Sequence, residues 1–97
     1  MIVERRTFKV KPFCEQATAE FVKEAHAVFG QPNVRRLYMP ISGLGNVIYQ
    51  EFEFEDWQER EEFWAAFLAL PEIPEWTEKW KTLTESGGTT EFLELVE

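Results

Sequence analysis

The sequence predicts an α+β fold with the element order β-α-β-β-α-β and an antiparallel four-stranded sheet. Three observations support this fold class. Residues 2–10 alternate in polarity, as a half-buried strand does. Apolar residues between Pro12 and Gly30 recur at three- and four-residue spacing, which is typical of an amphipathic helix. Two further strand-like segments are joined by a glycine-containing loop, which predicts a hairpin.

The first predicted strand spans residues 2–10. Successive side chains of a strand point to opposite faces, so the even-numbered residues share one face. We expect this face to lie under the helices and the other face to lie away from them. The even-numbered face carries Ile2, Glu4, Arg6, Phe8 and Val10. The odd-numbered face carries Val3, Arg5, Thr7 and Lys9.

The first predicted helix runs from Pro12 to its stop at Gly30. Proline favours the first position of a helix, and glycine favours the position just past its end. The polar face is expected to include Glu20, Lys23 and Glu24. The predicted apolar stripe consists of Phe13, Ala17, Phe21, Ala25, Val28 and Phe29.

Residues 33–41 and 46–54 are predicted to form the second and third strands. The segment Ser42-Gly43-Leu44-Gly45-Asn46 between them is predicted to be the hairpin loop. We assign the more apolar face of the third strand to the helices. That face carries Ile48, Gln50, Phe52 and Phe54. The opposite face, which would meet water or a second subunit, carries Val47, Tyr49, Glu51 and Glu53.

The rest of the chain, from residue 56 on, is predicted to form two helices and a strand. Asp56 can cap a helix, with Glu59 completing a capping-box-like pair, and Pro71 ends that helix. A shorter helix opens at Pro74 and bears Trp76 and Trp80 on one face. Gly87-Gly88 is expected to break it, and residues 89–96 form the last strand.

This order matches the split βαβ arrangement of ferredoxin-like folds, which leaves one sheet face without helices. We expect the bare face to meet a second copy of the sheet, so the chain would form a homodimer. The first and third strands are expected to be parallel neighbours. Their charges Arg5, Lys9, Glu51 and Glu53 then share the bare face, either in water or in an ordered interface.

The composition bounds the class of protein. Ninety-seven residues make a single domain, spanning residues 1–97. The formal charge of -8 disfavours nucleic acid and anionic membrane surfaces as partners. Cys14 is the only cysteine, and the N-terminal segment lacks the apolar run of a signal peptide, so we expect a cytoplasmic protein.

Motifs for catalysis are mostly lacking. One histidine and one cysteine do not make a zinc site, so no metal is predicted. Gly43-Leu44-Gly45 lacks a third glycine and a following helix, which favours a hairpin loop over phosphate binding. We predict no cofactor. Cys14 is interpreted as a bystander.

Polar residues on the apolar face of the sheet are the candidate site. Glu4 and Arg6 share that face with Phe8, and Gln50 shares it with Phe52. Buried charges must be paired, so two interpretations stay open. The three polar residues either form a closed structural network, or they line a pocket between sheet and helices. In the second case Phe8, Phe52 and Phe54 are its apolar walls.

His26 and the four tryptophans are the other residues considered. His26 on the first helix could point into the same cleft, where it would be suited to proton transfer. A lone histidine at the edge of an apolar stripe is more often a core or boundary residue. The tryptophans Trp57, Trp64, Trp76 and Trp80 are interpreted as core and interface residues.

Several short motifs resemble NIPSNAP-like domains. They are Met1-Ile2-Val3-Glu4-Arg5-Arg6-Thr7-Phe8 before Lys11-Pro12, then Gly43-Leu44-Gly45-Asn46, Gln50-Glu51-Phe52-Glu53-Phe54-Glu55, and Pro74-Glu75-Trp76. Departures are Gln50 for the family's histidine, Phe52 for its tryptophan and Gly45 for its leucine. The resemblance implies a dimeric α+β barrel, in which two four-stranded sheets face each other. Relatives of that barrel include cofactor-independent monooxygenases and haem-binding enzymes.

Three functional hypotheses follow. The first is a homodimeric domain of unknown function that binds a small polar or aromatic molecule between sheet and helices. The second is a cofactor-independent monooxygenase-like or isomerase-like enzyme that uses the same cleft, with His26 as a proton acceptor. The third is a structural or protein-interaction module whose ligand is another chain.

Overall fold

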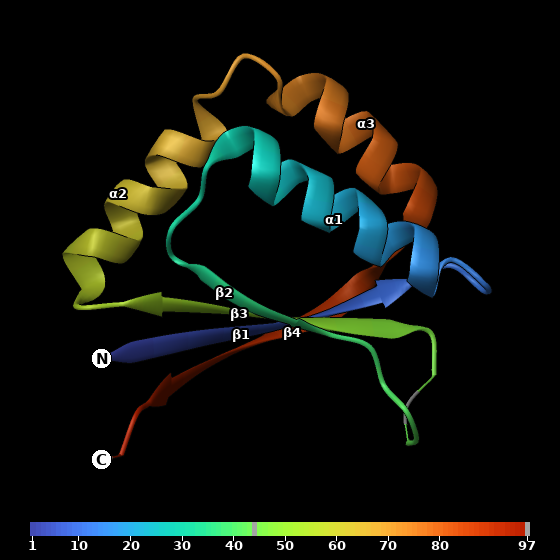
Figure 1. The fold of residues 1–97 in the computed structure, drawn as a ribbon, viewed down its shortest axis with the longest axis horizontal. Coiled ribbons are helices and arrows are strands. Elements are labelled where there is room, and N and C mark those ends of the chain that lie inside the picture. Colours follow the sequence, from blue (N-terminus) through green and yellow to red (C-terminus); the bar gives the residue numbers. More distant parts are fainter. Residues whose placement is uncertain (44, 97) are drawn as a thin grey trace.

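The computed structural model describes residues 1–43 and 45–96, which form three helices and four strands (Figure 1). In chain order they are β1 (Ile2–Val10), α1 (Glu15–Phe29), β2 (Val34–Tyr38), β3 (Val47–Phe54), α2 (Trp57–Leu68), α3 (Ile73–Leu83) and β4 (Thr84–Glu94). The predicted α+β fold is confirmed. No helix of this described part of the chain is both long and apolar enough to cross a bilayer.

The sheet has the strand order β2-β3-β1-β4, and each pair is antiparallel. The expectation that the first and third strands are parallel is therefore wrong. α1 returns the chain so that β2 runs in the direction of β1, and the hairpin then brings β3 back between them in the opposite direction. In this register Glu4 lies opposite Phe52, and Arg6 lies opposite Gln50.

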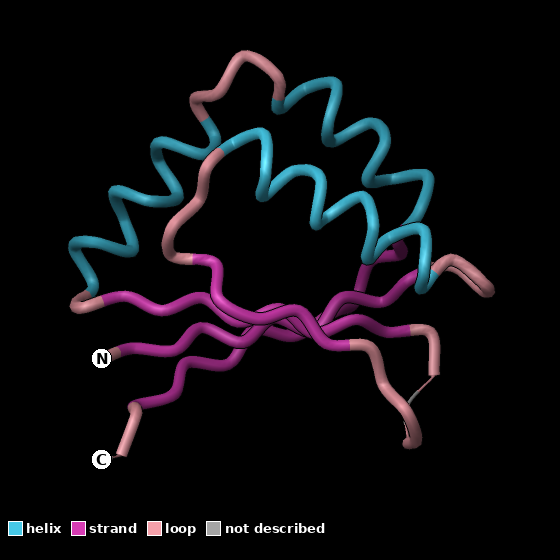
Figure 2. Tube along the Cα trace, in the orientation of Figure 1, coloured by secondary structure: helices cyan, strands magenta, loops and turns pink. Residues whose placement is uncertain are grey.

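All three helices lie on one face of the sheet (Figure 2). The core forms where this face meets α1, around the buried residues Val10, Val22 and Ile48. Phe8, Leu37 and Trp80 pack against them. None of the three helices covers the other face, which we call the open face of the sheet (Figure 1). It includes Val3, Arg5, Thr7, Tyr49, Glu51 and Leu93.

α1 begins three residues later than predicted. Phe13 adopts a left-handed φ of 65° and is 98% exposed, so the chain turns there before the helix starts at Glu15. The predicted apolar stripe is wrong in part. Phe13 lies before the helix, and Ala17 and Val28 lie on the side of α1 that faces water. The buried residues of α1 are Thr18, Ala19, Val22 and Ala25. Gly30 ends the helix in the left-handed conformation, as predicted.

α2 and α3 begin where the sequence places them. The Asp56 side chain accepts a hydrogen bond at 2.8 Å from the backbone N–H of Glu59, which confirms the cap. The Glu59 carboxylate in turn accepts from the N–H of Glu55 at 3.0 Å. Pro74 occupies the first turn of α3. The hairpin loop is described except for Leu44, which lies outside the described residues.

Gly87 and Gly88 do not break the chain before the last strand, contrary to the prediction. β4 starts at Thr84 and runs through both glycines, with a bulge where it pairs with Thr7 and Lys9. Gly87 has a φ of 99°, which L-residues rarely adopt. A Cβ atom on Gly88 would clash with the carbonyl oxygen of Thr7. The glycines therefore allow close strand pairing at a bulge.

Candidate functional site

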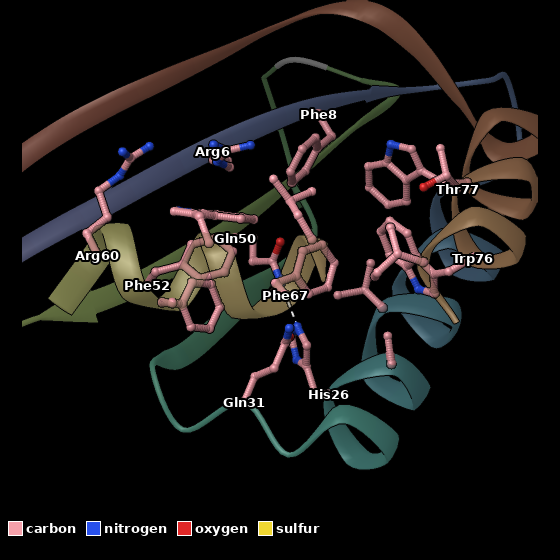
Figure 3. Close-up of a pocket in the computed structure, with 17 residues that line it drawn as sticks. Arg6, Phe8, His26, Gln31, Gln50, Phe52, Arg60, Phe67, Trp76 and Thr77 are labelled. Carbon is pink, nitrogen blue, oxygen red and sulfur yellow. Dashed lines mark hydrogen bonds between the residues drawn. The ribbon is translucent and has the colours of Figure 1, made fainter. Parts of the chain in front are cut away.

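A cavity of about 450 Å³ lies between the sheet and the helices (Figure 3). β1 and β3 supply its floor, and all three helices supply its walls. Its aromatic lining residues are Phe8, Phe52, Phe63, Trp64, Phe67, Trp76 and Trp80. Its polar lining residues are Arg6, His26, Gln31, Gln50, Arg60 and Thr77. We call this space the central cavity.

Glu4 lies behind the wall of the central cavity and is fully buried. Its Oε2 accepts a hydrogen bond from Arg6 Nε at 2.6 Å. Its Oε1 accepts from Arg60 Nε at 2.8 Å and from Trp64 Nε1 at 3.2 Å. One buried carboxylate thus ties β1 to α2 through three side-chain donors.

The Glu4 carboxylate is held in its charged form. Burial alone works to raise its pKa, but the hydrogen bonds from Arg60, Arg6 and Trp64 outweigh burial, so the pKa lies below the usual value. A charged carboxylate with three donors satisfies the requirement that a buried ion be paired. The predicted structural network therefore exists around Glu4 and Arg6, but its other members are Arg60 and Trp64, not Gln50.

Arg6 and Arg60 line the central cavity, and some of their guanidinium N–H groups have no hydrogen-bond partner among the described residues. Each uses its Nε to bind Glu4. Among the described residues, the terminal Nη atoms of Arg6 have no hydrogen-bond partner, and Arg60 Nη1 makes one long contact of 3.4 Å with the exposed Glu61. The Arg6 guanidinium carbon also lies 4.3 Å from the centre of the Trp64 ring, a cation–π contact.

Gln50 and His26 meet across the cavity floor. The Gln50 amide nitrogen lies 2.6 Å from His26 Nε2, as the dashed line in Figure 3 shows. Burial lowers the pKa of His26, so the imidazole is neutral near pH 7. An amide nitrogen can only donate, so a neutral imidazole accepts this bond at Nε2 and carries its own proton on Nδ1.

Aromatic rings build the rest of the wall by packing on one another. The rings of Trp76 and Trp80 stack with their centres 5.2 Å apart. The Phe8 ring meets the Trp80 ring edge-on, with 4.9 Å between the ring centres. The ring centres of Phe52 and Trp64 lie 5.2 Å apart. Trp76 Nε1 is buried without a hydrogen-bond partner among the described residues. Buried N–H groups of this kind are rare, and one beside a cavity is available to a ligand.

The structure brings most of the predicted site residues together. Arg6, Phe8, Gln50 and Phe52 line the central cavity, and so does His26. Two predicted residues lie outside the lining. Glu4 is behind the wall, and Phe54 is buried beneath the Phe63 ring at 5.4 Å. Both support the wall from behind.

Sequence reasoning missed Arg60, Trp64, Trp76 and Trp80 as cavity residues. The signal for Arg60 was present, because Arg60, Phe63, Trp64 and Phe67 recur at helical three- and four-residue spacing on α2. A charged residue within an apolar stripe needs a buried partner, and Glu4 is that partner. The tryptophans were interpreted as core and interface residues. Trp80 does pack against the core, and it also lines the cavity together with Trp64 and Trp76.

No protein-family model matches the sequence, and no curated protein matches it. Solved structures do match its fold. A NIPSNAP domain protein from Burkholderia xenovorans superimposes with a TM-score of 0.86 at 16% identity, covering 99% of this chain and 95% of that one. A NIPSNAP family protein of unknown function from Agrobacterium tumefaciens gives a TM-score of 0.83 at 20% identity, with 96% and 86% covered.

An antibiotic biosynthesis monooxygenase is a more distant match. It gives a TM-score of 0.68 at 12% identity, with 100% of both chains covered. This chain therefore has the ferredoxin-like α+β fold of NIPSNAP-domain proteins, as the sequence resemblance implied. Identities this low show the fold, and a fold alone does not fix a function.

Proposed function

We propose that this chain binds a small, mainly aromatic molecule in the central cavity and that it works as a homodimer. The cavity carries this proposal. About 450 Å³ is a usual size for a ligand site, and such sites combine apolar walls with a few convergent polar groups. Here the walls are aromatic, and the polar groups come from β1, β3, all three helices and the loop after α1.

The homodimer would form through the open face of the sheet. That face leaves apolar side chains in water, including Leu93 at 38% exposed and Tyr38 at 43% exposed. It also holds an ordered ion pair, because Arg5 donates to Glu51 Oε2 through Nη2 at 2.7 Å. A second copy would cover the apolar groups and meet charges that are already paired. The proposed location of this dimer is the cytoplasm.

A cavity-filling substitution tests the binding proposal. Ala25 lines the cavity, whereas Ala27 on the same helix faces water. Ala25→Phe should abolish binding of the neutral probe 2-naphthamide in a calorimetric titration, and Ala27→Phe should leave it unchanged. Thermal unfolding of both variants checks that they fold, and Ala25→Leu is the milder replacement. Equal affinity for all variants would place the probe elsewhere and reject the proposal.

A second candidate is the cofactor-independent monooxygenase-like or isomerase-like enzyme with His26 as a proton acceptor. The neutral imidazole in the cavity favours it. However, His26 Nε2 is already hydrogen-bonded to Gln50, so the amide would have to move before this nitrogen could accept a proton. Binding is therefore the stronger proposal. The enzyme proposal would become the stronger one if the protein converted a bound compound and His26→Asn abolished that conversion without changing the affinity for the compound.

The third candidate is a purely structural module, in which the Glu4 network serves stability alone. Replacing only Glu4 and Arg6 would leave Arg60 and Trp64 without an acceptor. The informative variant therefore replaces Glu4, Arg6 and Arg60 by leucine and Trp64 by phenylalanine, so that no donor of the network is left without its acceptor. A structural network should tolerate it with little loss of stability. A ligand site should lose affinity for its ligand while the chain stays folded.

A further inference from the structure

The central cavity has positive charge on its wall. If the cavity binds a ligand, as the proposed function requires, this charge selects for the charge of that ligand. Two arginine residues, Arg6 and Arg60, are among those that line the cavity. Among the described lining residues there is no aspartate and no glutamate. Glu4, behind the wall, neutralises one of the two positive charges. The wall therefore keeps an excess of one positive charge.

The nearest other charges do not cancel this excess. Glu61 contacts Arg60 Nη1 at 3.4 Å, but its side chain is 75% exposed, so water screens the interaction. His26 is neutral near pH 7 because burial lowers its pKa. The chain as a whole carries a charge of -8, but distant surface charges are screened beyond roughly 8–10 Å at physiological salt. The local excess is what a bound molecule meets.

The two guanidinium groups are also held in place. Glu4 binds the Nε of each, through a different carboxylate oxygen. Trp64 lies against the Arg6 guanidinium at 4.3 Å, and Phe92 lies 5.0 Å from the Arg60 guanidinium carbon. Their side chains are only 28% and 21% exposed. Fixed arginines with free Nη atoms match the two oxygens of a carboxylate.

The two arginines lie at one side of the cavity, and Trp76 lies at the other (Figure 3). The space between them is bounded by rings, among them Phe52 and Phe67. We infer that the ligand is a monoanionic aromatic compound, with a carboxylate or a similar anion against Arg6 and Arg60. Its ring system lies along the aromatic wall. Glu4 acts as a positioning residue that holds both arginines and does not touch the ligand.

A matched pair of probes tests this inference. 2-Naphthoate and 2-naphthamide share the same ring system, and only the first carries a charge. Calorimetric titration of the wild-type protein at pH 7.5 should show that naphthoate binds about tenfold more tightly or better, as expected of charge-assisted hydrogen bonds. Arg60→Met should remove most of this preference, measured as the ratio of the naphthoate affinity to the naphthamide affinity of the same variant.

The control variant is Arg35→Met. Arg35 is 57% exposed on β2 and pairs with Glu53 at 3.2 Å, away from the cavity lining, so its loss should not change either affinity. Naphthamide binding also shows that Arg60→Met remains folded. Equal affinity of both probes for the wild type would overturn the inference and leave the proposed function standing. Failure of both probes to bind would reject the two together.

Discussion

Arg60 on α2 donates a hydrogen bond of 2.8 Å through its Nε to Glu4 on β1, across 56 residues of the chain. Glu4 binds Arg6 in the same way, at 2.6 Å from Nε to Oε2. This carboxylate is both the centre of a buried network and the support for two cationic groups of the cavity wall. The network and the pocket, which the sequence left as alternatives, are therefore adjacent parts of one arrangement.

Glu4→Gln should strongly destabilise the protein. Removing one member of a buried ionic network costs about 3–5 kcal/mol, and the lower end applies here because both arginines retain contact with water. The free energy of unfolding in urea measures this change. Glu53→Gln is the matched control, since its partners Arg35 and Arg36 are mostly exposed and the expected loss is about 0–1 kcal/mol. Similar losses for both variants would refute the assigned role of Glu4.

Gly88→Ala should destabilise the sheet by roughly 2 kcal/mol or more, because the new Cβ atom would clash with the Thr7 carbonyl on β1. Gly45→Ala is the control, since nothing lies within 4 Å of its Cβ position and its φ is not positive. Thermal unfolding of both variants checks this. Equal melting temperatures would mean that β4 does not pair closely with β1 at the bulge.

Stability should fall as the pH drops below about 6.5, and His26 should account for part of the fall. Burial lowers the pKa of His26 from its ordinary value of 6.5, so the unfolded chain takes up this proton at a higher pH than the folded chain. Protonation below pH 6.5 therefore favours the unfolded state until the folded pKa is reached. His26→Gln should flatten this segment of the stability curve.

A second loss of stability should follow at lower pH. The pKa of Glu4 lies below its ordinary value of 4.5, so the stabilisation that its charge provides is present above that pH and is lost as the pH falls. Urea unfolding from pH 8 down to about pH 3 covers both windows and separates them. A flat profile between pH 5 and pH 7 in the wild type would contradict the role given to His26.

The proposed dimer makes a separate prediction. Leu93 lies on the open face of the sheet opposite Val3, and it is 38% exposed in the single chain. Leu93→Asp would place a charge in the interface, so native mass spectrometry should show dimers for the wild type and monomers for the variant. Val28→Asp is the control, since Val28 lies on α1, away from the open face, and is 74% exposed. A monomeric wild type would reject the dimer but not the cavity.

The sequence predicted the fold through its periodic elements. Alternation in residues 2–10 placed Glu4, Arg6 and Phe8 on the helix-covered face, as observed. Capping signals placed the starts of α2 and α3 and the end of α1. Local rules failed where tertiary pairing decides. Gly87-Gly88 is typical of a break in secondary structure, yet β4 runs through both glycines. The backbone of β1 lies so close to β4 at this point that a side chain at Gly88 would not fit.

The candidate site was only partly predictable for a related reason. Gln50 and Arg6 were visible as polar residues in apolar strands. The pairing of Glu4 with Arg60 depends on how α2 packs across the sheet, which no local pattern specifies. The tryptophans of α3 face inward at core spacing, but the space beside them stays unfilled, and only the three-dimensional packing shows this.

A crystal structure of the protein bound to 2-naphthoate tests the central claim most directly. We expect the ring system in the central cavity, between the sheet and the helices, with its carboxylate within hydrogen-bond distance of a free Nη atom of Arg6 or Arg60. Glu4 should keep both of its Nε contacts in that structure. A naphthoate bound on the open face of the sheet, with the cavity filled by its own side chains, would contradict the account.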